Sequence, residues 1–83
     1  MPDKQQRLEI WKKLLLELDN IKIDLSEKEF EELSKTELSG GAITNVVNFA
    51  LLKSNFTNSA ISYNLLKDGI VRELRKENRL TSL

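Results

Sequence analysis

A pair of glycines stands directly before one of the apolar repeats of the sequence. Gly40 and Gly41 follow Ser39 and precede a stretch with helical spacing. The first amides of a helix have no partner within it, so a phosphate or a ribose could face them. Glycine also leaves the backbone free to adopt a positive φ and to be approached closely. A tight turn that packs two helices together explains the same pair without any ligand.

Other residue types that catalysis uses are missing. The chain has no cysteine and no histidine, which excludes thiolate nucleophiles, catalytic triads and the commonest metal ligands. It contains no Gly-x-x-x-x-Gly-Lys-Ser/Thr phosphate loop and no calcium-loop pattern of carboxylates. The glutamates at positions 29, 31, 32 and 37 are typical of a solvated helix surface. We therefore expect that this chain alone is not an enzyme.

The charge balance argues against a nucleic-acid partner. Thirteen basic residues match thirteen acidic ones, so no excess positive field attracts phosphates. The densest basic stretch is interrupted by two glutamates; it comprises Arg72, Glu73, Arg75, Lys76, Glu77 and Arg79. No apolar run is long enough for a membrane span, and no secretion signal opens the chain. We expect a cytoplasmic domain without membrane or nucleic-acid contacts.

Apolar spacing and capping residues predict an all-α domain of four helices over residues 1–83. The predicted helices cover residues 3–19, 26–36, 41–54 and 62–77, followed by a frayed tail at 78–83. Asp3 can cap the first helix, and Ser26 with Glu29 forms a capping box for the second. Gly69 lies inside the fourth helix at a cost, although apolar spacing continues through it and glycine permits close helix packing.

Two short extended segments are also expected. Residues 21–25 alternate between apolar and polar side chains, which is typical of a strand. A pairing with residues 60–62 would add a very small extended pair to the four helices.

Several motifs, taken in order, resemble the small C-terminal subdomain, or lid, of AAA+ ATPases. The family typically opens this subdomain with Pro-Asp, three residues, Arg, two residues, Ile and an apolar residue. The resemblance covers about residues 2–79. Its matching segments are Pro2-Asp3-x-x-x-Arg7-x-x-Ile10-Trp11, Ile23-Asp24-Leu25, Leu33-Ser34-Lys35-Thr36, Ser39-Gly40-Gly41-Ala42-Ile43-Thr44-Asn45 and Leu66-x-x-Gly69-Ile70-x-x-Glu73.

The resemblance implies a lid packed beside a P-loop domain that this chain lacks, with nucleotide between the two. By position, Ile10 would contact adenine and Leu14 would occupy a neighbouring place on the same wall. Gly40 and Gly41 would let the backbone approach the base and the ribose. ATP or ADP would bind in the parent protein, with Mg held by the absent domain, and the isolated chain would hold no cofactor.

The resemblance further implies that the lid couples ATP binding and hydrolysis to motion of the next subunit in a ring. The partners would then be the P-loop domain of the same chain, neighbouring subunits and a protein substrate that is remodelled. Two features depart from parts of the family. Residues 42–44 contain no arginine that could act as the sensor found in some branches of the family. In this respect the chain is similar to the branch that includes the proteasomal and membrane-protease ATPases. The C-terminal Leu80-Thr81-Ser82-Leu83 lacks the hydrophobic-Tyr-x tail that docks into a protease.

Two interpretations of the chain follow. In the first it is a fragment of a longer ATPase, and apolar residues such as Ile10, Leu16 and Leu52 face the large domain or a neighbouring subunit. In the second it is a stand-alone helical adaptor that binds a partner helix or groove. The adaptor interpretation accounts for the core and the balanced charge, but under it the order of the motifs is a coincidence.

Overall fold

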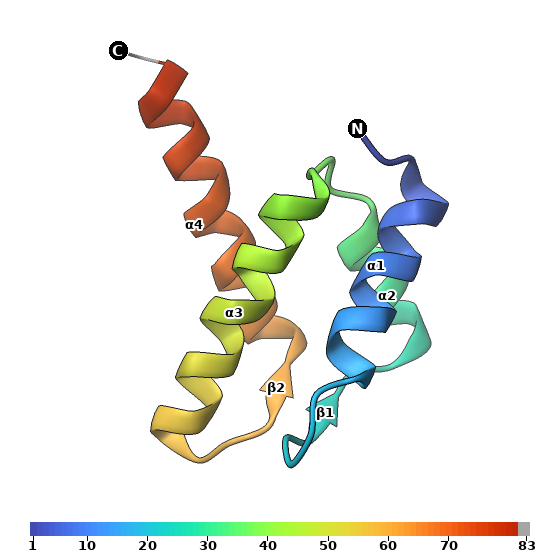
Figure 1. Ribbon diagram of the computed structural model, residues 1–83, viewed down its shortest axis with the longest axis vertical. Helices are drawn as coiled ribbons and strands as arrows, with labels where there is room; N and C mark the ends of the chain where they lie inside the picture. The colour runs from blue at the N-terminus through green and yellow to red at the C-terminus, as the bar shows by residue number, and fades with distance from the viewer. Residues whose placement is uncertain (82–83) are drawn as a thin grey trace.

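The computed structural model describes residues 1–81, with side chains up to Glu77. Within this part the chain forms four helices and two very short strands (Figure 1), which confirms the predicted all-α class. The elements are α1 (Lys4–Leu16), β1 (Ile23–Asp24), α2 (Glu27–Ser34), α3 (Gly40–Thr57), β2 (Ile61–Ser62) and α4 (Tyr63–Thr81). No helix in these described residues is long and apolar enough to cross a membrane.

The first two helices begin where their caps predict. The Asp3 carboxylate accepts a hydrogen bond from the Gln6 amide at 2.8 Å, and the Gln6 side chain accepts one from the Asp3 amide. Ser26 and Glu29 form the same reciprocal pair at the start of α2. Both helices end earlier than predicted, at Leu16 and Ser34. After α1 the chain leaves the helical path through Asn20, which adopts a left-handed φ of 62°.

The two strands pair in parallel and join distant parts of the chain. Ile23 lies opposite Ile61, and Asp24 lies opposite Ser62. Figure 1 shows the pair at the end of the molecule where α1 leads toward α2 and α3 leads toward α4. The expected extended pair is therefore present. It ties the connection between α1 and α2 to the connection between α3 and α4.

Helix α3 is longer than predicted at its C-terminal end. Residues 54–59 have the composition of a loop, yet the helix continues to Thr57 and closes at Asn58. Asn58 adopts a left-handed φ of 54°, and the Ser59 amide donates to the Ser54 carbonyl at 3.1 Å. The Thr57 hydroxyl donates to the Lys53 carbonyl at 2.8 Å, so a polar side chain is accommodated by the helix itself.

Helix α4 runs through Gly69 without a break. A Cβ atom at Gly69 would lie 2.8 Å from Cγ1 of Val46 and 3.1 Å from Cδ2 of Phe49, so the glycine lets α4 pack closely on α3. The helix starts at Tyr63, with the Ser62 hydroxyl accepting from the Leu65 amide. It extends to Thr81, four residues beyond the predicted end at 77. Residues 82–83 of the predicted frayed tail lie outside the described residues.

The core lies where the four helices meet, and most of its members match the predicted inner faces. Its buried residues are Trp11, Leu15, Phe30, Leu33, Leu38, Ala42, Ile43, Val46, Val47, Ala50, Ile61, Leu66 and Ile70. The apolar spacing of Leu66, Ile70 and Leu74 predicts that all three face inward from α4, but the Leu74 side chain is 37% exposed, so this prediction is wrong for Leu74. The adjacent Glu73 is buried in its place and is held by polar contacts with its neighbours.

Candidate functional site

Two of the four predicted site residues meet in space. A Cβ atom on Gly40 would lie 4.0 Å from Cδ1 of Ile10, so α1 and the first turn of α3 touch at this point. Both residues are half-buried, which leaves part of the contact open to solvent. The fold thus brings together an apolar side chain and a backbone segment that lie far apart in the sequence.

The backbone around Gly40 is the exposed start of a helix. Ser39 caps α3, and its hydroxyl accepts from the Ala42 amide at 3.1 Å. The first intrahelical hydrogen bond runs from the Ile43 amide to the Ser39 carbonyl at 3.0 Å. The amides of Gly40 and Gly41 precede this bond, so the helix does not use them. They can donate to an external oxygen.

The glycine pair does not serve a special backbone conformation. No glycine in the described chain has a positive φ, and Gly40 and Gly41 are the first two residues of α3 rather than a turn. The expectation that the pair uses left-handed backbone freedom is therefore wrong. A Cβ atom on Gly41 would meet only Oγ of Ser39, at 4.0 Å. Because neither glycine carries a side chain, the space beside the free amides of Gly40 and Gly41 stays open.

A shallow hollow on the outer side of α1 adjoins Ile10. It is lined by Pro2, Gln6, Glu9, Ile10 and Lys13. Ile10 is the residue that connects this hollow to Gly40. The other predicted apolar residue, Leu14, is half-buried against the core as Ile10 is, but it does not line the hollow. The structure therefore brings Ile10 next to Gly40, while Gly41 follows Gly40 along α3 and Leu14 lies one turn further along α1.

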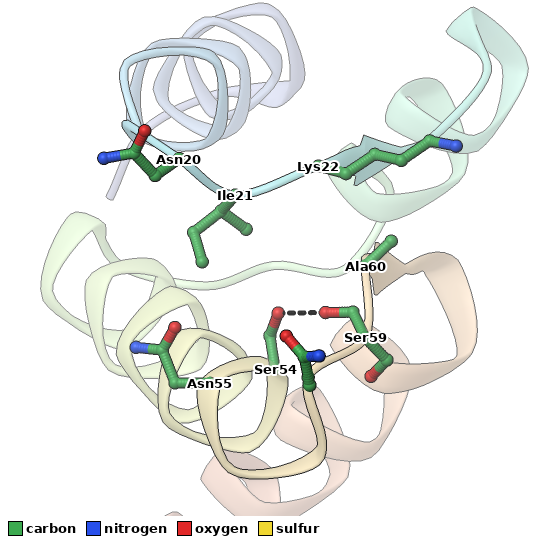
Figure 2. Close-up of a pocket in the computed structure, with 8 residues that line it drawn as sticks. Asn20, Ile21, Lys22, Ser54, Asn55, Ser59 and Ala60 are labelled. Atoms are coloured by element: carbon green, nitrogen blue, oxygen red, sulfur yellow. Dashed lines mark hydrogen bonds between the residues drawn. The ribbon is translucent and has the colours of Figure 1, made fainter.

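A second hollow lies at the far end of α3 (Figure 2). It is lined by Asn20, Ile21, Lys22, Ser54, Asn55, Asn58, Ser59 and Ala60. The Ser54 hydroxyl points across to the Ser59 carbonyl and donates a hydrogen bond to it. The amide and hydroxyl side chains that line this hollow include no nucleophile that a neighbouring base activates. Among the described residues, no group of three His, Cys, Asp or Glu side chains could hold a metal ion.

Two buried charged residues near α3 and α1 were not predicted from the sequence. Glu73 on α4 is 8% exposed and accepts from Nδ2 of Asn45 at 3.0 Å and from Nζ of Lys76 at 3.1 Å. Burial raises the pKa of Glu73, but the hydrogen bonds from Asn45 and Lys76 outweigh it, so the net pKa is lowered. Arg7 on α1 is 7% exposed and binds backbone carbonyls. Both residues belong to motifs of the family resemblance, but no local pattern of charge or spacing predicts their burial.

Comparison with known proteins gives no family assignment. No family model, curated protein or solved structure matches the chain. The resemblance to the AAA+ lid therefore rests on the ordered motifs of the sequence.

Proposed function

We propose that this chain is the C-terminal lid of an AAA+ ATPase. In this proposal Ile10, Gly40 and Gly41 form part of the wall around adenine and ribose. A P-loop domain elsewhere in the parent protein binds the phosphates and Mg and carries out hydrolysis. The lid then couples nucleotide state to neighbouring subunits of a ring in the cytoplasm, which remodels a protein substrate.

The observation that carries the proposal is the contact between Ile10 and Gly40. The family resemblance implies that these two positions face the same nucleotide, and their atoms lie 4.0 Å apart when a Cβ is placed on Gly40. An apolar side chain suits the face of a purine, while free amides at a helix start suit the polar ribose. The partial exposure of both residues leaves the surface available to a ligand and a second domain.

Photolabelling of the native protein tests this proposal. The protein that contains this chain would be purified from its source cells, irradiated with an azido-adenine analogue of ADP and digested with trypsin. We expect label in the peptide 8–12, which contains Ile10, or in the peptide 36–53, which contains Gly40 and Gly41. Excess unlabelled ADP should abolish the labelling. Label confined to other peptides of this chain, or none in it, would contradict the proposal.

A stand-alone adaptor is the second candidate, and one feature of α3 favours it. Leu52 and Phe56 lie one turn apart and are 71% and 91% exposed. Large apolar side chains at this spacing are typical anchors for a partner helix. In an adaptor, Phe56→Ser would abolish partner capture and Ile10→Ala would leave it intact. In a lid, Ile10→Ala would be the variant that weakens adenine labelling.

A further inference from the structure

Arg7 is a buried charge whose two hydrogen-bond partners are backbone carbonyls. Its Nε donates to the Ser34 carbonyl at 2.8 Å, and its Nη1 donates to the Pro2 carbonyl at 2.7 Å. Only 7% of the residue is exposed. Burying a guanidinium is costly unless its N–H groups are satisfied, so these two carbonyls are what hold it inside.

The first of these carbonyls belongs to the end of a helix. Ser34 is the last residue of α2, and the last four carbonyls of a helix have no partner within it. The same end carries the negative pole of the helix dipole, and α2 has no basic residue in its last turn. Arg7 adds a buried positive charge from α1 at this end, where the C-cap residue Lys35 is exposed and pairs with Glu32. Arg7 therefore caps α2 from a different helix.

The second carbonyl belongs to the segment that enters α1. Pro2 precedes the Asp3 cap, so its carbonyl lies outside the helix. One planar guanidinium thus binds the entering segment and the end of α2 at once. From Ser34 the chain leads directly to Ser39 and Gly40, and Ile10 lies one turn beyond Arg7 on α1. Both bonds are therefore made by segments that are close in sequence to Ile10 or to Gly40.

We propose that Arg7 is a positioning residue that makes the entering segment and the Ile10–Gly40 surface one rigid body. Movement of a domain joined before Pro2 would then be transmitted to this surface without a hinge between them. This use of the rigid body rests on the proposed function. The rigidity itself is a property of this chain and can be measured without nucleotide.

Energy transfer within the chain measures this rigidity. The chain has one tryptophan, Trp11, which is buried in the core and serves as donor. An acceptor dye can be attached to the N-terminal amine of Met1, which is 89% exposed. Time-resolved transfer then reports the width of the distance distribution between the entering segment and the core. Circular dichroism would establish that each variant is folded.

Three variants distinguish the effect of losing the two Arg7 hydrogen bonds from the effect of a general loss of stability. Arg7→Met keeps the aliphatic stem and removes both bonds; Arg7→Lys keeps the charge but cannot span two carbonyls with a planar fork. Asn45→Ala is the matched control, because it removes a hydrogen bond between α3 and α4 and leaves both Arg7 bonds in place. We expect both Arg7 variants to widen the distribution about twofold, as an ordered segment becomes mobile, and Asn45→Ala to leave it unchanged.

An unchanged width in the Arg7 variants would overturn the proposal, and so would equal widening in Asn45→Ala. If Arg7→Met fails to fold, Arg7→Lys decides between these results. The outcome is separate from that of photolabelling. If the distance distribution widens but adenine does not label the chain, Arg7 is a positioning residue and the proposed function is wrong. If adenine labels the chain but the distribution does not widen, the proposed function stands and the role of Arg7 is wrong.

Discussion

The glycines of this chain differ in what surrounds them. Gly69 lies where α4 crosses α3, and a Cβ there would come within 2.8 Å of the buried Val46 side chain. Gly41 lies at the exposed start of α3, where a Cβ would meet only Oγ of Ser39 at 4.0 Å. The first glycine is required by packing. The second is not, so its purpose has to be sought in what approaches from outside.

Alanine substitutions should therefore have opposite effects at these two positions. Gly69→Ala gains about 1 kcal/mol of helix propensity but adds an atom to a filled interface, which typically costs about 1–3 kcal/mol. We expect a net loss of about 1 kcal/mol. Gly41→Ala should stabilise the fold by about 0.5 kcal/mol, because the unfolded chain loses freedom and no atom is in the way. Urea unfolding of both variants measures the difference, and equal signs would refute this interpretation.

A larger residue at Gly41 separates folding from nucleotide handling. Gly41→Val places a branched side chain over the two free amides of α3 without meeting the core. If the proposed parent ATPase exists, we expect weaker adenine labelling and ATP turnover in it, while the unfolding midpoint of the isolated chain changes little. Gly41→Ala is the smaller matched control. A loss of fold stability as large as the loss of turnover would mean that the glycine serves the fold alone.

The buried carboxylate of Glu73 should make the stability of the chain depend on pH. Its pKa is lowered in the folded state from an ordinary value of 4.5 by the hydrogen bonds that offset its burial. The unfolded chain then binds the proton more readily, so this contribution is present above pH 4.5 and is lost as pH falls through the folded pKa. Urea unfolding between neutral and acidic pH should show this decline. Glu73→Gln should flatten it; an unchanged slope would exclude Glu73 as its source.

At the scale of elements, caps account for what the sequence could predict. Asp3, Ser26 and Ser62 each stand at a helix start, because a capping side chain bonds to amides only a few residues away. Helix ends depend on less specific signals. The end of α3 was missed because Ser54 and Thr57 resemble loop residues, although each donates its hydroxyl to a backbone carbonyl. Such bonds are visible only in the folded chain.

The end of α3 should depend on Asn58. This residue closes the helix with a left-handed φ of 54°, which asparagine and glycine tolerate better than alanine. We expect Asn58→Ala to destabilise the chain by about 1 kcal/mol and Asn58→Gly to change it by less than about 0.5 kcal/mol. Thermal unfolding measures both. Asn55→Ala, at an exposed helical position nearby, is the control; an equal loss there would show that the φ of Asn58 is not the cause.

At the candidate site, the sequence could predict that Ile10 and Gly40 belong together only through the family resemblance. No local pattern links a residue on α1 to one at the start of α3, because their contact is made by tertiary packing. The burial of Arg7 was missed for the same reason, since its carbonyl partner Ser34 lies on another helix. Leu14 is partly buried against the core, as Ile10 is, and its place on the wall stays a prediction.

At the scale of the molecule, several large apolar side chains remain outside the core. Leu16, Leu52 and Phe56 are all more than half exposed, the first two as predicted. Leu52 and Phe56 lie on the C-terminal half of α3, toward the opposite end of that helix from Gly40 (Figure 1). A lid would place such residues against other parts of a ring, whereas an adaptor would use them for its partner. The size of the native protein separates these two cases.

The central claim is tested most directly by the mass of the native protein in its source cells, detected with an antibody raised against this domain. A lid predicts a band several times larger than 9.6 kDa, with a phosphate-binding loop encoded upstream of Pro2. A single band at 9.6 kDa would contradict the lid, because the cell would then make this domain alone.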